Sequence, residues 1–125
     1  MEKKKIMVVD DEEDFLRVVK LNMEETNEYE VLTLPSAKDI ISEIYKFRPK
    51  LILLDMLMPL VGGIDAGEML NNDPYGKSIP VIILSALDKD ADKLMAYKIG
   101  VVDYLTKPIE ANDLIVKIEK ALKDK

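Results

Sequence analysis

The sequence predicts one doubly wound α/β domain, in which five parallel strands in the order 2-1-3-4-5 form a sheet with helices on both faces. Short aliphatic runs without polar alternation, such as 51–54 and 81–84, are typical of strands buried on both faces. A segment with helical spacing of apolar residues follows each such run. The length of 125 residues fits a single domain with five strand–helix units.

The expected strands cover residues 5–9, 29–34, 51–55, 80–84 and 101–105. Apolar residues at three- and four-residue spacing predict helices at 15–26, 40–47, 64–70, 88–99 and 111–122. Ser36 follows a strand-ending proline and is expected to cap the second helix. Gly100 is expected to end the fourth helix at its C′ position.

Composition excludes several classes of protein. A net charge of −6 argues against a nucleic-acid-binding face, and no apolar run is long enough to span a membrane. The charged N-terminus lacks the apolar stretch of a signal peptide, which favours a cytoplasmic protein. Without histidine or cysteine, a Ser-His-Asp triad and imidazole or thiolate metal sites are excluded. A bound metal would have to be a hard ion held by oxygen, such as magnesium, manganese or calcium.

Residues 51–59 contain the predicted central strand and the aspartate that ends it. Four consecutive aliphatic residues end abruptly on Asp55, at the tip of the predicted central strand. Open α/β sheets place their ligand crevice at this edge. Because the next helix begins about nine residues later, Asp55 does not suit a helix cap. Pro59 and the pair Gly62–Gly63 interrupt regular structure after it.

Polar residues end four of the five predicted strands: Asp10 and Asp11, then Asp55, Ser85 and Lys107. The parallel topology should bring them together at one edge of the sheet. Two carboxylates about 4 Å apart repel by about 4 kcal/mol at an effective dielectric constant near 20, which a bound magnesium ion would relieve. A metal, an ammonium group and a hydroxyl around one carboxylate are what a phosphoryl group requires.

Each of these residues also has a purely structural interpretation. The Asp10–Asp11 pair could be the acidic first turn of a helix, and Ser85 could be a helix cap. Lys107 could be an exposed lysine in a turn, and Tyr104 a core aromatic residue. Their occurrence together at successive strand ends favours a shared site.

The whole chain resembles the receiver domain of bacterial and archaeal two-component response regulators, whose fold is the flavodoxin-like, CheY-like one. The resemblance implies a receiver domain over residues 1–125, either stand-alone or excised from a longer regulator. It rests on an ordered set of marks: Asp10–Asp11, Asp55 in Asp-x-x-Met-Pro, Gly63, Ser85–Ala86, Gly100, Asp103–Tyr104–Leu105 and Lys107–Pro108.

The resemblance implies that Asp55 is the phosphoacceptor and takes the phosphoryl group from the phosphohistidine of a sensor kinase or phosphotransfer protein. Asp11, Asp55 and the backbone carbonyl of Leu57 would bind Mg²⁺ directly, and Asp10 largely through water. Mn²⁺ would be an alternative ion. The domain would assist only its own phosphorylation and dephosphorylation, and would not be an enzyme acting on other substrates.

Further roles follow from the same resemblance. Lys107, Ser85 and Ala86 would bind the phosphoryl group. Ser85 and Tyr104 would form a switch that reports phosphorylation on the face made by the fourth helix, fifth strand and fifth helix. A downstream effector protein or domain would read this face. The peptide bond between Lys107 and Pro108 would be cis.

Self-association is expected to be weak, because the charged pairs that hold dimers of such domains are only partly present. Lys93 and Asp113 are of opposite sign, as are Asp103 and Lys117. Val102 and Asp124 stand where a further acid–base pair would be needed, so one pair is absent. We therefore expect a monomer or a weak phosphorylation-dependent dimer, with no direct binding to nucleic acid or membrane.

Two rival classes fit less well. A haloacid-dehalogenase-type phosphatase would carry Asp-x-Asp-x-Thr after the first strand, whereas Asp10 is followed by Glu12 and no threonine. A flavin carrier would need a phosphate-binding loop there, and the acidic run 10–14 would repel phosphate.

Overall fold

The structure is a computed structural model that describes residues 2–56, 58, 61–86, 97 and 100–123. Its five strands form one parallel sheet in the order β2-β1-β3-β4-β5, so the predicted fold class and strand order are confirmed. The strands are β1 Lys4–Val9, β2 Tyr29–Leu34, β3 Leu51–Asp55, β4 Val81–Ser85 and β5 Asp103–Thr106. The helices are α1 Glu13–Glu24, α2 Ile40–Phe47, α3 Gly63–Asn71 and α5 Ala111–Lys123, with a short 3-10 helix at Gly76–Ser78.

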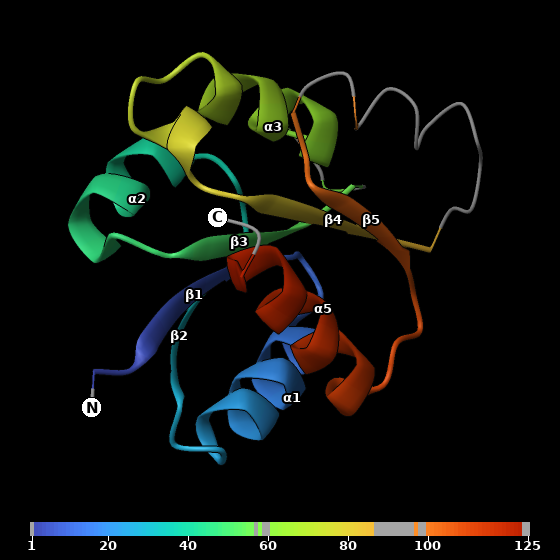
Figure 1. Cartoon of the computed structure of the whole chain (residues 1–125). Coiled ribbons are helices and arrows are strands. Elements are labelled where there is room, and N and C mark those ends of the chain that lie inside the picture. The colour runs from blue at the N-terminus through green and yellow to red at the C-terminus, as the bar shows by residue number, and fades with distance from the viewer. Residues whose placement is uncertain (1, 57, 59–60, 87–96, 98–99, 124–125) are drawn as a thin grey trace.

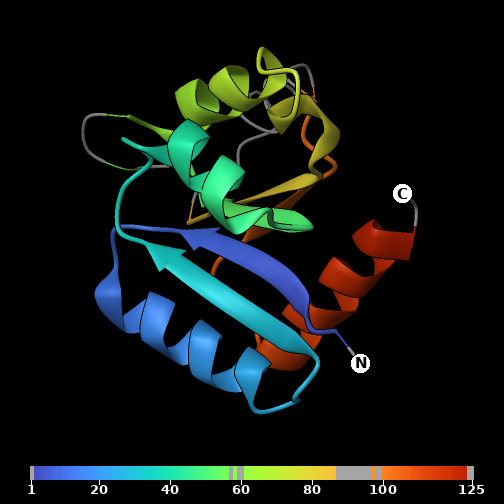
Figure 2. The same cartoon turned by 90° about the vertical axis from the view of Figure 1, so that its left-hand side faces the viewer.

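The sheet lies between two helical layers, with α2 and α3 on one face and α1 and α5 on the other (Figures 1 and 2). Successive side chains of β1 enter different cores. Met7 and Val9 pack with residues of α2 and α3, whereas Ile6 and Val8 pack with residues of α1 and α5. This double burial explains the uninterrupted aliphatic runs of the sequence. None of the described helices is both long and apolar enough to cross a membrane.

Some local predictions were wrong. Ser36 does not cap α2: its hydroxyl accepts the N–H of Lys38 at 3.0 Å, and the N-cap position belongs to Asp39. β5 begins at Asp103 and not at residue 101. The N–H of Val102 still donates to the carbonyl of Val81 at 2.8 Å, so the backbone pairs with β4 just before β5 begins.

The helix predicted over residues 88–99 lies outside the described residues, except for Tyr97. Gly100, which was expected to end this helix, has a φ angle of 93°. This is the left-handed conformation that a glycine at C′ adopts.

The edge strand β2 is tied to α1 by two side chains. Lys20 donates to the carbonyl of Val31 at 2.6 Å, and Glu24 accepts the N–H of Val31 at 3.0 Å. Lys20 and Glu24 are themselves paired at 3.3 Å. Both backbone groups of Val31 are thereby satisfied on the side of β2 that has no neighbouring strand. The pKa of Glu24 is lowered overall. The hydrogen bond from the N–H of Val31 is the main cause, burial opposes it, and the charge and hydrogen bond of Lys20 add to the lowering.

We expect Glu24→Ala to lower the free energy of unfolding by about 1 kcal/mol at neutral pH, because the N–H of Val31 loses its acceptor. Since the pKa of Glu24 is lowered by folding, its contribution is present above the ordinary pKa of a glutamate and disappears as the pH falls through the folded-state pKa. Urea unfolding of wild type and variant from pH 7 to pH 3 measures this. The neighbouring Glu25→Ala is the control, and an equal, pH-independent loss in both variants would contradict the prediction.

Candidate functional site

Three neighbouring strands bring the predicted site residues to one edge of the sheet. Asp10 directly follows β1, Asp55 ends β3 and Ser85 ends β4. The backbone continues this alignment past the strands, because the N–H of Lys107 donates to the carbonyl of Ser85 at 2.7 Å. The order of the sheet therefore converts residues far apart in the chain into a single cluster.

Three carboxylates form the acidic part of this cluster. One oxygen from each of Asp10, Asp11 and Asp55 lies within 4.8 Å of the others. Asp10 is fully buried and Asp55 is 6% exposed, whereas Asp11 faces solvent. Oxygen donors crowded in this way suit a hard divalent cation such as Mg²⁺. The residues present thus fit the ion that the sequence predicted.

Lys107 supplies the positive charge of the cluster. Its ammonium group lies 2.5 Å from Asp10 Oδ2, 3.2 Å from Glu12 Oε1 and 3.7 Å from Asp55 Oδ1. Burial lowers the pKa of Lys107, but the hydrogen bond to Asp10 and the charges of Asp55 and Asp10 outweigh burial and raise the pKa overall. Lys107 is therefore held as a cation among the acids.

Two contacts of Lys107 were not anticipated from the sequence. Glu12 forms an ion pair with it in addition to those of Asp10 and Asp55, and the ring centroid of Phe15 lies 4.4 Å from its ammonium group. The backbone N–H of Glu12 also donates to Asp10 Oδ1 at 2.9 Å, so both oxygens of Asp10 are engaged. The acidic run after β1 indicated that an acid could lie near Lys107. Only the conformation of this turn shows that this acid is Glu12.

A close backbone approach joins the start of α3 to the end of β3. The N–H of Gly63 donates to the carbonyl of Met56 at 2.8 Å. A Cβ atom on Gly63 would lie 2.4 Å from the carbonyl oxygen of Asp55 and 2.7 Å from Cα of Met56. Gly63 therefore permits α3 to start directly against the strand tip that carries Asp55.

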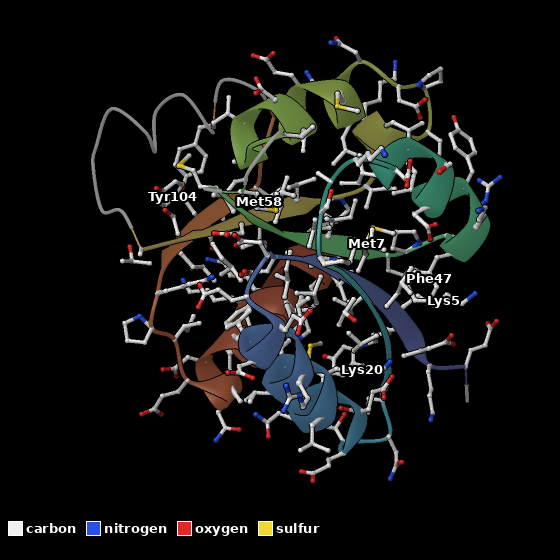
Figure 3. All side chains as sticks on the ribbon, turned by 180° about the vertical axis from the view of Figure 1, so that it is seen from behind. Lys5, Met7, Lys20, Phe47, Met58 and Tyr104 are labelled. Atoms are coloured by element: carbon white, nitrogen blue, oxygen red, sulfur yellow. The ribbon has the colours of Figure 1, made fainter. Side chains whose placement is uncertain are left out.

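The remaining predicted residues lie around this cluster or outside the described part of the chain. Ser85 is fully buried, and Ala86 is exposed. Tyr104 is buried on the face of the sheet covered by α2 and α3 (Figure 3), and its hydroxyl group donates to Met56 Sδ at 3.4 Å. The peptide bond between Lys107 and Pro108 is cis. Leu57, a predicted ligand through its carbonyl, lies outside the described residues.

We expect Asp11→Asn to raise the free energy of unfolding by about 0.5–1 kcal/mol in metal-free buffer, because it removes one of three repelling charges. None of the ion pairs of Lys107 involves Asp11, so none is lost. Thermal unfolding in the presence of a chelator measures the effect. Asp65→Asn, in the first turn of α3, is the control. A clear destabilisation specific to Asp11→Asn would count against a shared acidic pocket.

Comparison with known proteins identifies the class. The family described as the response regulator receiver domain matches residues 6–119. The alkaline phosphatase synthesis transcriptional regulatory protein PhoP of Bacillus subtilis is 30% identical over 120 residues. That alignment covers 96% of this chain and 49% of PhoP, so the chain spans about half the length of this curated relative.

Solved structures agree with this assignment. The receiver domain of the Francisella response regulator 1452 is 30% identical, with a TM-score of 0.88 and 98% of each chain covered. The chemotaxis protein CheY4 of Vibrio cholerae has a TM-score of 0.90, with 96% of this chain and 99% of that chain covered. At 21% identity, CheY4 supports the fold alone. The chain belongs to the family of response regulator receiver domains of two-component systems.

Proposed function

We propose that this domain accepts a phosphoryl group on Asp55 from the phosphohistidine of a sensor kinase or phosphotransfer protein, in a magnesium-dependent reaction. One observation carries the proposal. The Asp55 carboxylate lies at a strand tip, within 4.8 Å of two further carboxylates and 3.7 Å from the ammonium group of Lys107. A nucleophile, a set of oxygen ligands and a fixed cation thus meet at one point.

In the proposed reaction, a carboxylate oxygen of Asp55 attacks the phosphorus atom while the phosphorus–nitrogen bond of the donor breaks. The imidazole of the donor leaves with the electron pair of that bond, and Asp55 becomes an acyl phosphate. Lys107 turns from the acids to a phosphoryl oxygen, and Ser85 and Ala86 bind the other oxygens. Water later hydrolyses the acyl phosphate, which releases inorganic phosphate and restores the carboxylate of Asp55.

Asp11 and Asp55 would hold Mg²⁺ together with the carbonyl of Leu57, and Asp10 would act largely through water. Mn²⁺ fits the same donors. The ion supplies charge neutralisation for the phosphoryl oxygens. Asp10 also keeps Lys107 in place through the hydrogen bond between them.

The output of the domain would depend on Ser85 and Tyr104. A shift of Ser85 toward the phosphoryl group would leave room for Tyr104, and the change would be read on the surface that includes β5 and α5. A downstream effector protein or domain would bind there. Within this proposal the chain is a receiver domain over residues 1–125, works in the cytoplasm, and is not an enzyme acting on other substrates.

The labelling experiment that tests this function uses acetyl phosphate as a small donor. Incubation of the protein with acetyl phosphate and Mg²⁺ should add the mass of one phosphoryl group. Prior chelation of the metal should abolish the addition. Unchanged labelling after chelation would contradict the magnesium requirement, and absence of labelling by this donor and by a phosphorylated histidine kinase would contradict the function.

We expect a monomer without phosphate and at most a weak dimer after phosphorylation. Lys117 Nζ lies 3.9 Å from Asp103 Oδ2 of the same chain, so these two charges already offset one another, and exposed ion pairs contribute at most about 1 kcal/mol. Val102 is exposed and offers apolar area, while Lys93 and Asp124 lie outside the described residues. Sedimentation velocity of both forms at micromolar concentration measures this. A tight dimer of the unphosphorylated protein would contradict it.

A further inference from the structure

A pocket lies at the opposite edge of the sheet from the carboxylates, where β3 and β4 begin. Its volume is about 590 Å³, which is within the usual range for ligand sites. Its wall combines the cations Arg48 and Lys50 with an apolar floor formed by Pro49, Ile79 and Leu122. None of the predicted phosphoryl-transfer residues contributes to it.

Arg48 is held in place by aromatic rings. Its guanidinium group lies 4.4 Å from the ring centroid of Tyr75 and 5.3 Å from that of Tyr45. Asp73 fixes both tyrosines, because it accepts the hydroxyl group of Tyr45 at 2.9 Å and the N–H of Tyr75 at 3.0 Å. It also accepts the N–H of Gly76 at 2.8 Å. The position of Arg48 is therefore set before any ligand arrives, which reduces the entropy lost on binding.

The charge of this arginine is not neutralised within the described part of the chain. Among those residues, neither Arg48 nor Lys50 forms an ion pair, although the chain as a whole carries a net charge of −6. Asp73, the acid that contacts Tyr45 and Tyr75, already accepts hydrogen bonds from the Tyr45 hydroxyl group and from backbone N–H groups. Contact of aromatic rings with a guanidinium leaves its in-plane N–H groups able to bind a carboxylate through two hydrogen bonds.

A third cation, Lys5, belongs to the neighbouring strand β1. Lys50 donates its backbone N–H to the carbonyl of Lys5 at 2.7 Å, which places the start of β1 beside the start of β3. The ammonium group of Lys5 lies 5.5 Å from the ring centroid of Phe47 at the end of α2 (Figure 3). Lys5, Arg48 and Lys50 thus lie at or just before the starts of β1 and β3, at the edge of the sheet opposite the three carboxylates.

We propose that this pocket binds an acidic peptide segment of a partner protein, independently of phosphorylation. A carboxylate of the segment pairs with Arg48 and Lys50, and an adjacent aliphatic side chain of the segment packs on Pro49, Ile79 and Leu122. The charge complementarity and the apolar floor select a ligand that is acidic and apolar at neighbouring positions.

A peptide fits these walls better than a nucleotide does. Tyr75 is the aromatic residue that lines the pocket, and the guanidinium of Arg48 already lies 4.4 Å from its ring centroid. The floor consists of proline and aliphatic side chains, which offer no flat surface for a base to stack on. The two cations that line the pocket are enough to bind one carboxylate, but they would leave most of the negative charge of a triphosphate unpaired.

The test uses ¹⁵N-labelled protein and a capped hexapeptide of alternating glutamate and leucine. Titration should shift the backbone amide signals of Lys50, Tyr75 and Ile79, and the matched glutamine–leucine peptide should not. Arg48→Gln should weaken binding about tenfold or more, as expected when charge-assisted hydrogen bonds are lost. Lys46→Gln is the control, because Lys46 is an exposed cation of α2 that pairs with Glu43 at 3.9 Å and does not line the pocket.

Each outcome decides the proposal. Selective shifts that Arg48→Gln reduces and Lys46→Gln does not would support it. Absence of shifts at millimolar peptide, equal binding of the neutral peptide, or equal loss in both variants would overturn it. Tighter binding of ATP or inorganic phosphate at the same signals would replace the peptide by a small anion and would also overturn it. An unfolding curve of Arg48→Gln like that of wild type shows that a weaker titration reports the site and not the fold.

Discussion

Asp55→Asn is expected to take up no phosphoryl group from acetyl phosphate, with labelling at least about 100-fold below wild type, because an amide is not a nucleophile at this position. In the proposed function Asp55, and not Asp10 or Asp11, is the acceptor. Both oxygens of Asp10 are engaged, one by the N–H of Glu12 and the other by Lys107. Asp55 ends the central strand and is 6% exposed, whereas Asp11 lies on the open side of the cluster.

Intact mass and peptide mapping of wild type and variant measure this effect. Asp103→Asn is a matched control, since Asp103 is a partly exposed aspartate at the start of β5, two strands from β3 and at the opposite edge of the sheet from Asp55. Its labelling should equal that of wild type. Retained labelling of Asp55→Asn, at any residue, would show that the phosphoacceptor has been assigned incorrectly.

The fold was predictable because its signals are local and repeated. Aliphatic runs such as 51–54 require burial on both faces, which only a covered parallel sheet provides. The first residue of a helix was less predictable where a side chain forms a local hydrogen bond other than the one that would cap the helix. Ser36 resembles a helix cap in sequence, yet its hydroxyl binds the N–H of Lys38, and the helix starts four residues later at Ile40.

The candidate site was predictable to the extent that residues sit at strand ends, since topology alone brings Asp10, Asp55 and Lys107 together. The pairing of Glu12 with Lys107 depends on how one turn bends, which periodicity does not record. The contacts that surround Arg48 were also not predicted. They join the end of α2 to the segment before β4 through residues about 30 positions apart, and the positions of strand ends in the sequence do not indicate such contacts.

The second large effect concerns Gly63, the first residue of α3. We expect Gly63→Ala to lower the free energy of unfolding by about 3 kcal/mol, the cost of forcing a methyl group into tightly packed surroundings. The new Cβ would lie 2.4 Å from the carbonyl oxygen of Asp55 and 2.7 Å from Cα of Met56. Both obstacles are backbone atoms, so no side chain can rotate away, and α3 must move from the tip of β3.

Gly62→Ala is the control that separates this clash from the intrinsic effect of alanine. Its Cβ would lie 3.4 Å from the carbonyl oxygen of Met56, an ordinary contact, so we expect a change within about 1 kcal/mol. Urea unfolding of the two variants measures the difference. Because the clash falls on the backbone of Asp55 itself, Gly63→Ala should also slow labelling by acetyl phosphate under conditions where the variant is still folded, whereas Gly62→Ala should not. Equal stability of the two variants would show that the chain between β3 and α3 relaxes freely and does not hold Asp55 in place.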